Sequence, residues 1–153
     1  MKETVRSVWK FFVEEAELGL DTPMDVYYFG STKEVADSLS ELVVKGVKRG
    51  TTSAVWEYEH YCEDFPKQNE YSIITDFEGE PKCIIRTINV LRLNFNEVDE
   101  RLALIEGEGD KSLEYWRRVH KDIFTRILPS IGKEFNDSMP VVFEEFETVY
   151  VCQ

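Results

Sequence analysis

The sequence is poor in the residues that hold metals and disulfides. Its three cysteines, Cys62, Cys83 and Cys152, are widely spaced and form no CxxC pair, and only His60 and His120 could serve as imidazole ligands. A structural zinc site needs four such ligands at close spacing. We therefore expect no metal, no disulfide framework and no cofactor, and we expect Cys83, which lies in an apolar run, to be a buried thiol.

Long apolar segments are also missing. No 18 consecutive residues are apolar, and the first residues, Met1 to Thr4, do not resemble the apolar run of a signal peptide. We therefore expect a protein that does not enter a membrane, and we predict a cytoplasmic location with reduced thiols.

Positive charge is scarce. Thirty acidic residues against 18 basic ones give a net charge of −12, which repels polyanions. Because generic nucleic-acid binding depends on Lys and Arg neutralising phosphates, binding to long nucleic acids is disfavoured, whereas a small ligand or a partner with a basic surface remains compatible. The chain is 42% hydrophobic and 13% aromatic, which excludes a disordered chain, and 153 residues fit a single domain, 1–153.

The pattern of apolar residues predicts an α+β fold. Helical spacing indicates helices over residues 4–18, from a Ser31–Glu34 capping box to Gly46, over 98–105, and from Ser112 to Pro129. Runs rich in β-branched and aromatic residues predict strands over 52–61, 71–77, 83–94 and 141–151. Strands from both ends of the chain with helices between them suggest a small mixed β-barrel closed by the last strand.

A basic turn, residues 45–51, follows the second predicted helix and contains Lys48 and Thr51 at a spacing of three. At the junction of helix and strand, such a lysine could orient an anionic or carbonyl group, or act as a base for the threonine hydroxyl. The same residues could equally be a solvated helix end whose cations complement the helix dipole.

An acidic loop, residues 106–110, places Glu106, Glu108 and Asp110 around two glycines. It could bind Mg²⁺ or Ca²⁺, although calcium-loop spacing is absent, or supply one acid or base. Its carboxylates could also simply stabilise the N-terminus of the helix that starts at Ser112, because they complement the helix dipole. On that helix Trp116 and His120 share one face and could stack on a planar base or pack in the core. Glu57 could likewise hydrogen-bond the edge of a base, or it could face water on an alternating strand.

The segment Gly46-Val47-Lys48-Arg49-Gly50-Thr51 resembles the GxKxxT signature of the ASCH family, a branch of the PUA-like β-barrels. The run from Glu106 to Trp116, with His120 and residues 95–98, is similar to a bacterial subfamily of ASCH proteins, and the resemblance covers about residues 25–151. It implies a PUA-like, partly open small mixed β-barrel with helices packed around it, and a helix over 4–18 outside that core.

The resemblance also implies a cleft for a nucleoside or a short RNA. One ASCH branch is an amidohydrolase that deacetylates N4-acetylcytidine with a Thr–Lys–Glu constellation, onto which Thr51, Lys48 and Glu106 map. In that branch an arginine stands where this chain has Ser53. A non-catalytic module for RNA or a modified base, or a ribonuclease, is the alternative. The remaining predicted ligand-binding residues are Arg49, Ser53, Glu57, Glu108, Asp110, Trp116 and His120.

Overall fold

Five strands make one mixed sheet in the computed structural model, which describes all residues 1–153. In chain order they are β1 (Met24–Tyr27), β2 (Gly50–Ala54), β3 (Tyr71–Thr75), β4 (Pro81–Asn94) and β5 (Pro140–Val151). Their order in space is β1-β3-β4-β5-β2, and only the β1–β3 pair is parallel. The last strand joins β2 to the sheet, but no ladder joins β1 to β2. The predicted α+β, PUA-like fold is confirmed, and the sheet stays open between β1 and β2.

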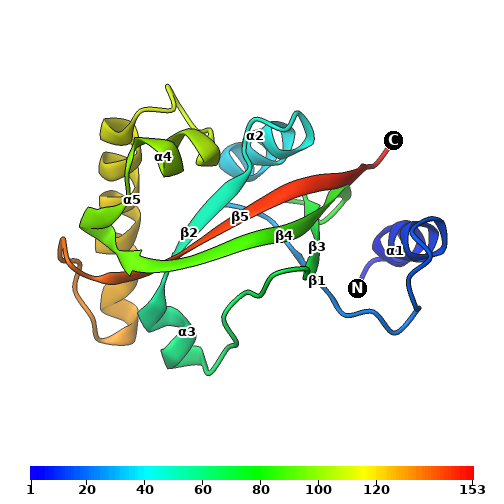
Figure 1. Cartoon of the computed structure of the whole chain (residues 1–153), viewed down its shortest axis with the longest axis horizontal. Helices are drawn as coiled ribbons and strands as arrows, with labels where there is room; N and C mark the ends of the chain where they lie inside the picture. The colour runs from blue at the N-terminus through cyan, green and yellow to red at the C-terminus, as the bar shows by residue number, and fades with distance from the viewer.

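Helices cover this sheet at several places (Figure 1). They are α1 (Glu3–Glu15), α2 (Lys33–Val44), α3 (Val55–Tyr61), α4 (Glu100–Glu106) and α5 (Leu113–Ile127), with 3₁₀ turns at Phe95–Glu97 and Leu128–Ile131. The long strands β4 and β5 run from α4 and α5 at one end to the side of α1 and the C-terminus at the other (Figure 1). None of the helices has the length and apolar character needed to span a bilayer.

The buried apolar residues form three clusters, one under each group of helices. The largest has 12 residues and joins α4 and α5 to the ends of β2, β4 and β5, with Phe95, Trp116 and Phe143 among its members. A second cluster packs the apolar face of α1 on β3 and β4, and a third lies beneath α2. The first cluster therefore fixes α4 and α5 against β2, where the basic turn and the acidic loop meet.

Two predicted helix boundaries are confirmed by their caps. Ser112 accepts a hydrogen bond from the Tyr115 N–H at 3.0 Å and so begins α5. Gly46, the residue after the C-cap Lys45 of α2, has a φ of +72°, a conformation that glycine adopts at little cost and that ends the helix. The basic turn is therefore a true helix-to-strand junction.

Other predicted boundaries are wrong. The strand expected over residues 52–61 stops at Ala54 and the chain continues as α3, because the ladder to β5 ends at Val141 and leaves later residues no partner. Thr32, not Ser31, caps α2, accepting from the Val35 N–H at 3.3 Å. The first helix ends at Glu15 rather than at residue 18. Strand β1 was not predicted, since four residues give too short a pattern.

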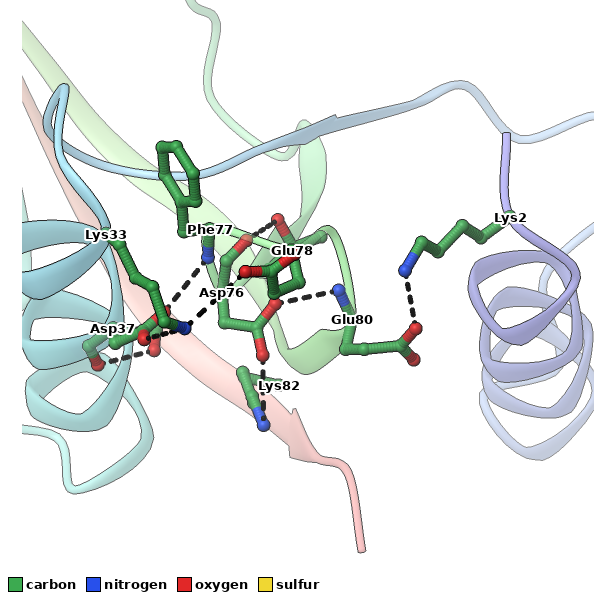
Figure 2. A network of polar contacts seen from close by, with 10 residues as sticks. Lys2, Lys33, Asp37, Asp76, Phe77, Glu78, Glu80 and Lys82 are labelled. Carbon is green, nitrogen blue, oxygen red and sulfur yellow. Dashed lines mark hydrogen bonds and ion pairs between the residues drawn. The ribbon is translucent and has the colours of Figure 1, made fainter.

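An exposed set of ion pairs ties the turn between β3 and β4 to both neighbouring helices (Figure 2). Lys2 Nζ lies 2.6 Å from Glu80 Oε1, and Lys33 Nζ lies 2.9 Å from Asp37 Oδ2 and 3.6 Å from Glu78 Oε1. Asp37 also accepts from the Phe77 N–H at 3.1 Å. We call Lys2, Lys33, Asp37, Glu78 and Glu80 the surface network.

Candidate functional site

A pocket of about 690 Å³ opens between the two edge strands β1 and β2. Asp25 and Tyr27 come to it from β1, and Thr51 and Ser53 from β2. Tyr58 from α3 and residues of the loop before β3 complete the rim. The volume lies within the 300–1,000 Å³ that small-molecule sites usually have, so one small molecule fits.

The lining of this pocket carries negative charge only. It contains five carboxylates and no lysine, arginine or histidine; the acids are Asp25, Glu63, Asp64, Glu70 and Glu144. Its walls also include the rings of Tyr27, Tyr58 and Phe65, flat surfaces on which a planar ligand can stack. The field inside therefore favours a neutral or cationic ligand over a phosphate.

Strand β2 separates this pocket from a second polar region. Along Gly50–Ala54 burial alternates, with Thr51 and Ser53 half-buried and lining the pocket, and Thr52 buried on the other face. Because successive side chains of a strand point to opposite faces, Thr52 meets α4 and α5 instead of the pocket.

That second region is a buried network around the carboxylate of Glu106, which is 1% exposed. Its Oε2 accepts from Thr52 Oγ1 at 2.6 Å and from Trp116 Nε1 at 2.5 Å. Its Oε1 lies 3.3 Å from His120 Nε2 and 3.7 Å from Lys48 Nζ. We call Lys48, Thr52, Glu106, Trp116 and His120 the buried network.

Lys48 is the cation of this network and is 1% exposed. Its Nζ donates to the Gly50 carbonyl at 2.7 Å and to Glu108 Oε2 at 2.9 Å, so Glu108 is a closer partner than Glu106. The Phe29 ring lies 4.9 Å from Nζ, and Phe29 also lines the pocket. The ammonium therefore sits one aromatic ring behind the pocket wall and holds the peptide that precedes Thr51.

A glycine allows the basic turn and the acidic loop to touch. Gly107 has a φ of +70°, and a Cβ there would lie 2.1 Å from the Val47 carbonyl oxygen. The Arg49 N–H donates to the Ile105 carbonyl at 2.8 Å beside it. A side chain at residue 107 would push the two segments apart and remove Glu106 and Glu108 from Lys48.

The charges in the buried network shift the pKa of two of its members, Glu106 and His120. Burial alone would raise the pKa of Glu106, but the neighbouring His120 and Lys48, with hydrogen bonds from His120 and Thr52, lower it from 4.5 to about 2. Burial opposes the charged form of His120, yet the Glu106 carboxylate raises the pKa of the imidazole above 6.5. Its Nδ1 lies 2.8 Å from the Trp116 carbonyl oxygen, consistent with an N–H on that nitrogen and an imidazolium facing Glu106.

Glu144 is the buried carboxyl group of the pocket. It is 9% exposed, lies opposite Thr51 in the β2–β5 ladder, and accepts from Thr87 Oγ1 at 2.7 Å through Oε1. Burial raises the pKa of Glu144. Burial, then the nearby Glu144, raises the pKa of the Tyr27 phenol well above 10. The pocket thus contains an acid, a phenol and hydroxyl groups close together.

Comparison with known proteins identifies the family. A family model for the ASCH domain matches residues 25–150. The chain belongs to the ASCH domain family. Solved structures similar to this ASCH domain include one from Lactobacillus crispatus JV-V101, described as an ASCH domain, at 30% identity, with a TM-score of 0.85 over 94% of this chain and 95% of that one. Another is from Enterococcus faecalis V583, at 34% identity, with a TM-score of 0.90 over 99% and 91%. No functionally curated protein matches the sequence.

The predicted site residues of this ASCH domain fall into three groups. Thr51 and Ser53 line the pocket. The buried network contains Lys48, Glu106, Trp116 and His120, and Glu108 lies at its edge. Within this network the rings of Trp116 and His120 stack on each other, with their centroids 4.1 Å apart. Arg49 and Asp110 are exposed and Glu57 is half-buried, and none of these three lines the pocket.

Several residues that build the two regions were missed from the sequence. Thr52, which holds Glu106, was not distinguished from Thr51, although alternation along a strand starting at Gly50 places it on the inner face. Glu144 had a signal of its own, an acid inside the run Val141–Phe146 whose apolar neighbours are buried on both faces of the sheet. Tyr27 lies on the strand that was not predicted.

Proposed function

We propose that this ASCH domain binds a nucleoside-sized ligand in the pocket between β1 and β2. The observation that supports it is the lining: tyrosine rings for a planar base, hydroxyl and carboxyl groups for its polar edge, and no basic side chain for a phosphate. An anionic pocket of about 690 Å³ suits a free nucleoside better than an RNA backbone. The same lining argues against a ribonuclease, whose phosphodiester substrate would meet five carboxylates.

A second proposal, hydrolysis of an amide on the bound base, rests on the position of Thr51. Its side chain lines the pocket, and the carbonyl before it is held by Lys48 Nζ at 2.7 Å. A threonine hydroxyl fixed beside a ligand can attack an acyl carbon if a base takes its proton. N4-acetylcytidine, whose acetyl group is joined to the base by an amide, is the substrate class that this proposal names.

The reaction takes place in two steps. Thr51 Oγ1 forms a bond to the acetyl carbon and gives up its proton, the C–N bond breaks, and the amine of cytidine leaves with a proton. Water then hydrolyses the acetyl ester of Thr51 to acetate and free hydroxyl. Lys48, which Glu106 and Glu108 hold, is the base in this step and has to release its own proton before it can accept that of Thr51. For this role Nζ has to exchange its bond to the Gly50 carbonyl for one to Thr51 Oγ1.

Two measurements test these proposals. Calorimetric titration with N4-acetylcytidine measures binding, and chromatography after incubation with the same nucleoside measures the release of cytidine. We expect binding by the wild type and by Thr51→Val, and cytidine release by the wild type alone. Thr125→Val, which removes a hydroxyl from the exposed side of α5, is the matched control and should release cytidine like the wild type.

The outcomes separate the two proposals. Binding without cytidine release identifies a non-catalytic binding module, and unchanged release by Thr51→Val rules out Thr51 as the nucleophile. If the wild type binds no nucleoside, the pocket assignment itself is wrong.

A further inference from the structure

Glu144 presents one carboxylate oxygen to the pocket with no partner in the protein. Thr87 Oγ1 donates to Oε1, and no protein group donates to Oε2. Every side-chain nitrogen or oxygen that is sealed from solvent has a hydrogen-bond partner in this structure. Since Glu144 is only 9% exposed and lines the pocket, Oε2 is the carboxylate oxygen left for a ligand there.

The groups around this oxygen suit a planar ligand with a polar edge. Glu144 is directly opposite Thr51 in the antiparallel ladder, so their side chains lie on one face with Cβ atoms roughly 5 Å apart. Tyr27 and Tyr58 line the same space and can hold the flat faces of a ring. A base that packs against one of these rings therefore shares the pocket with Glu144 and Thr51, which its edge can meet.

Resting on the proposed function, we propose that Glu144 Oε2 accepts an N–H from the edge of the bound base and so determines which nucleosides enter. Burial raises the pKa of this carboxyl group, but an N–H donated by the ligand favours the ionised form, which accepts hydrogen bonds and cannot donate them. Cytosine presents an exocyclic N–H at the position where uracil presents a carbonyl oxygen. The pocket thus selects bases that carry an amino or amide N–H, including one acylated on that nitrogen, over bases with a carbonyl there.

The charge around Glu144 makes this selection strong. Burial and the negative charges of Glu70 and Asp25 raise the pKa of this carboxyl group, while the Thr87 hydrogen bond and Lys48 lower it. The same negative charges disfavour a second acceptor beside Glu144. A ligand carbonyl set against Oε2 would leave two buried acceptors without a donor. Such a mismatch corresponds to a preference of about 10- to 100-fold in dissociation constant.

Calorimetric titration with cytidine and with uridine tests this assignment directly. The wild type should bind cytidine about 10- to 100-fold more tightly than uridine. Glu144→Gln keeps an oxygen for Thr87 but offers the pocket an amide, which can donate to O4 of uracil. We expect this variant to lose most of the preference while melting like the wild type.

Glu145→Gln is the matched control, because it removes one charge from the neighbouring residue, whose side chain points to the other face of β5. It should keep the wild-type preference. Equal preferences in Glu144→Gln and wild type, with both nucleosides binding, overturn the role of Glu144 and leave the proposed function intact. Failure of the wild type to bind either nucleoside overturns the proposed function and this inference together.

Discussion

The buried network and the surface network both pair lysine with carboxylates, the first in the protein interior and the second in contact with water. The side chains of Lys48 and Glu106 are 1% and 2% exposed, whereas those of Lys33 and Glu78 in Figure 2 are 54% and 63% exposed. In water an ion pair gains little, because solvent screens it and long side chains lose freedom in forming it. In the interior the same charges have lost their hydration, so each depends on its partner. Distance does not distinguish the two networks: the Lys33–Asp37 pair, at 2.9 Å, is shorter than the Lys48–Glu106 pair, at 3.7 Å.

Removing Glu106 should have the largest effect. Glu106→Ala leaves the charges of Lys48 and His120 buried with only Glu108 nearby, and we expect a loss of about 3–5 kcal/mol in the free energy of unfolding. Urea denaturation measures it. Glu100→Ala, on the exposed side of the same helix α4, should change stability far less. A loss of similar size in the two variants would show that the helix, not the network, is sensitive.

Acid should reveal the next effect. A carboxyl whose pKa is lower in the folded state than in the unfolded state stabilises the fold above the unfolded value and loses that contribution as pH falls. For Glu106 this window runs from about 4.5 down to about 2. The wild type should therefore lose stability steeply across it, and Glu106→Gln should show a shallower slope in urea midpoint against pH. Parallel slopes would contradict the lowered pKa.

Trp116→Phe should cost less, because it removes one hydrogen bond and keeps an aromatic ring beside His120. Glu106 Oε2 then retains only the Thr52 hydroxyl as a donor. We expect a loss of about 1–3 kcal/mol beyond that of a simple Trp-to-Phe change. Trp9→Phe supplies that reference, since the Trp9 indole lies in the α1 cluster without a side-chain hydrogen bond. If Trp116→Phe and Trp9→Phe lose equal stability in thermal or urea unfolding, the Trp116–Glu106 hydrogen bond does not stabilise the fold.

The smallest effect should come from the surface network. Lys33→Ala breaks the contacts to Asp37 and Glu78 at once, yet water solvates the freed carboxylates. The unfolding midpoint should stay close to that of the wild type, in low salt and in 0.5 M NaCl alike. A marked destabilisation at low salt would make the surface network more important than its exposure suggests.

Local signals predicted the framework of this site well. Ser112, Gly46 and the apolar spacing of α5 each act within a few residues, and each boundary that they set is where the structure has it. The strand predicted over 52–61 failed because a strand depends on its partner, and the β5 ladder ends opposite Ala54. Residues 52–61 by themselves indicate neither where that ladder ends nor which strand pairs with them.

The sequence by itself determined the α+β fold, the basic turn, the acidic loop and the family signature, because these depend on residue type at short spacing. Only the tertiary structure decided which threonine meets which acid. Thr51 and Thr52 are neighbours of the same type, and the register of β2 on β5 turns one to the pocket beside Glu144 and the other to Glu106. A shift of one residue would exchange their faces, and that register is fixed by packing across the sheet.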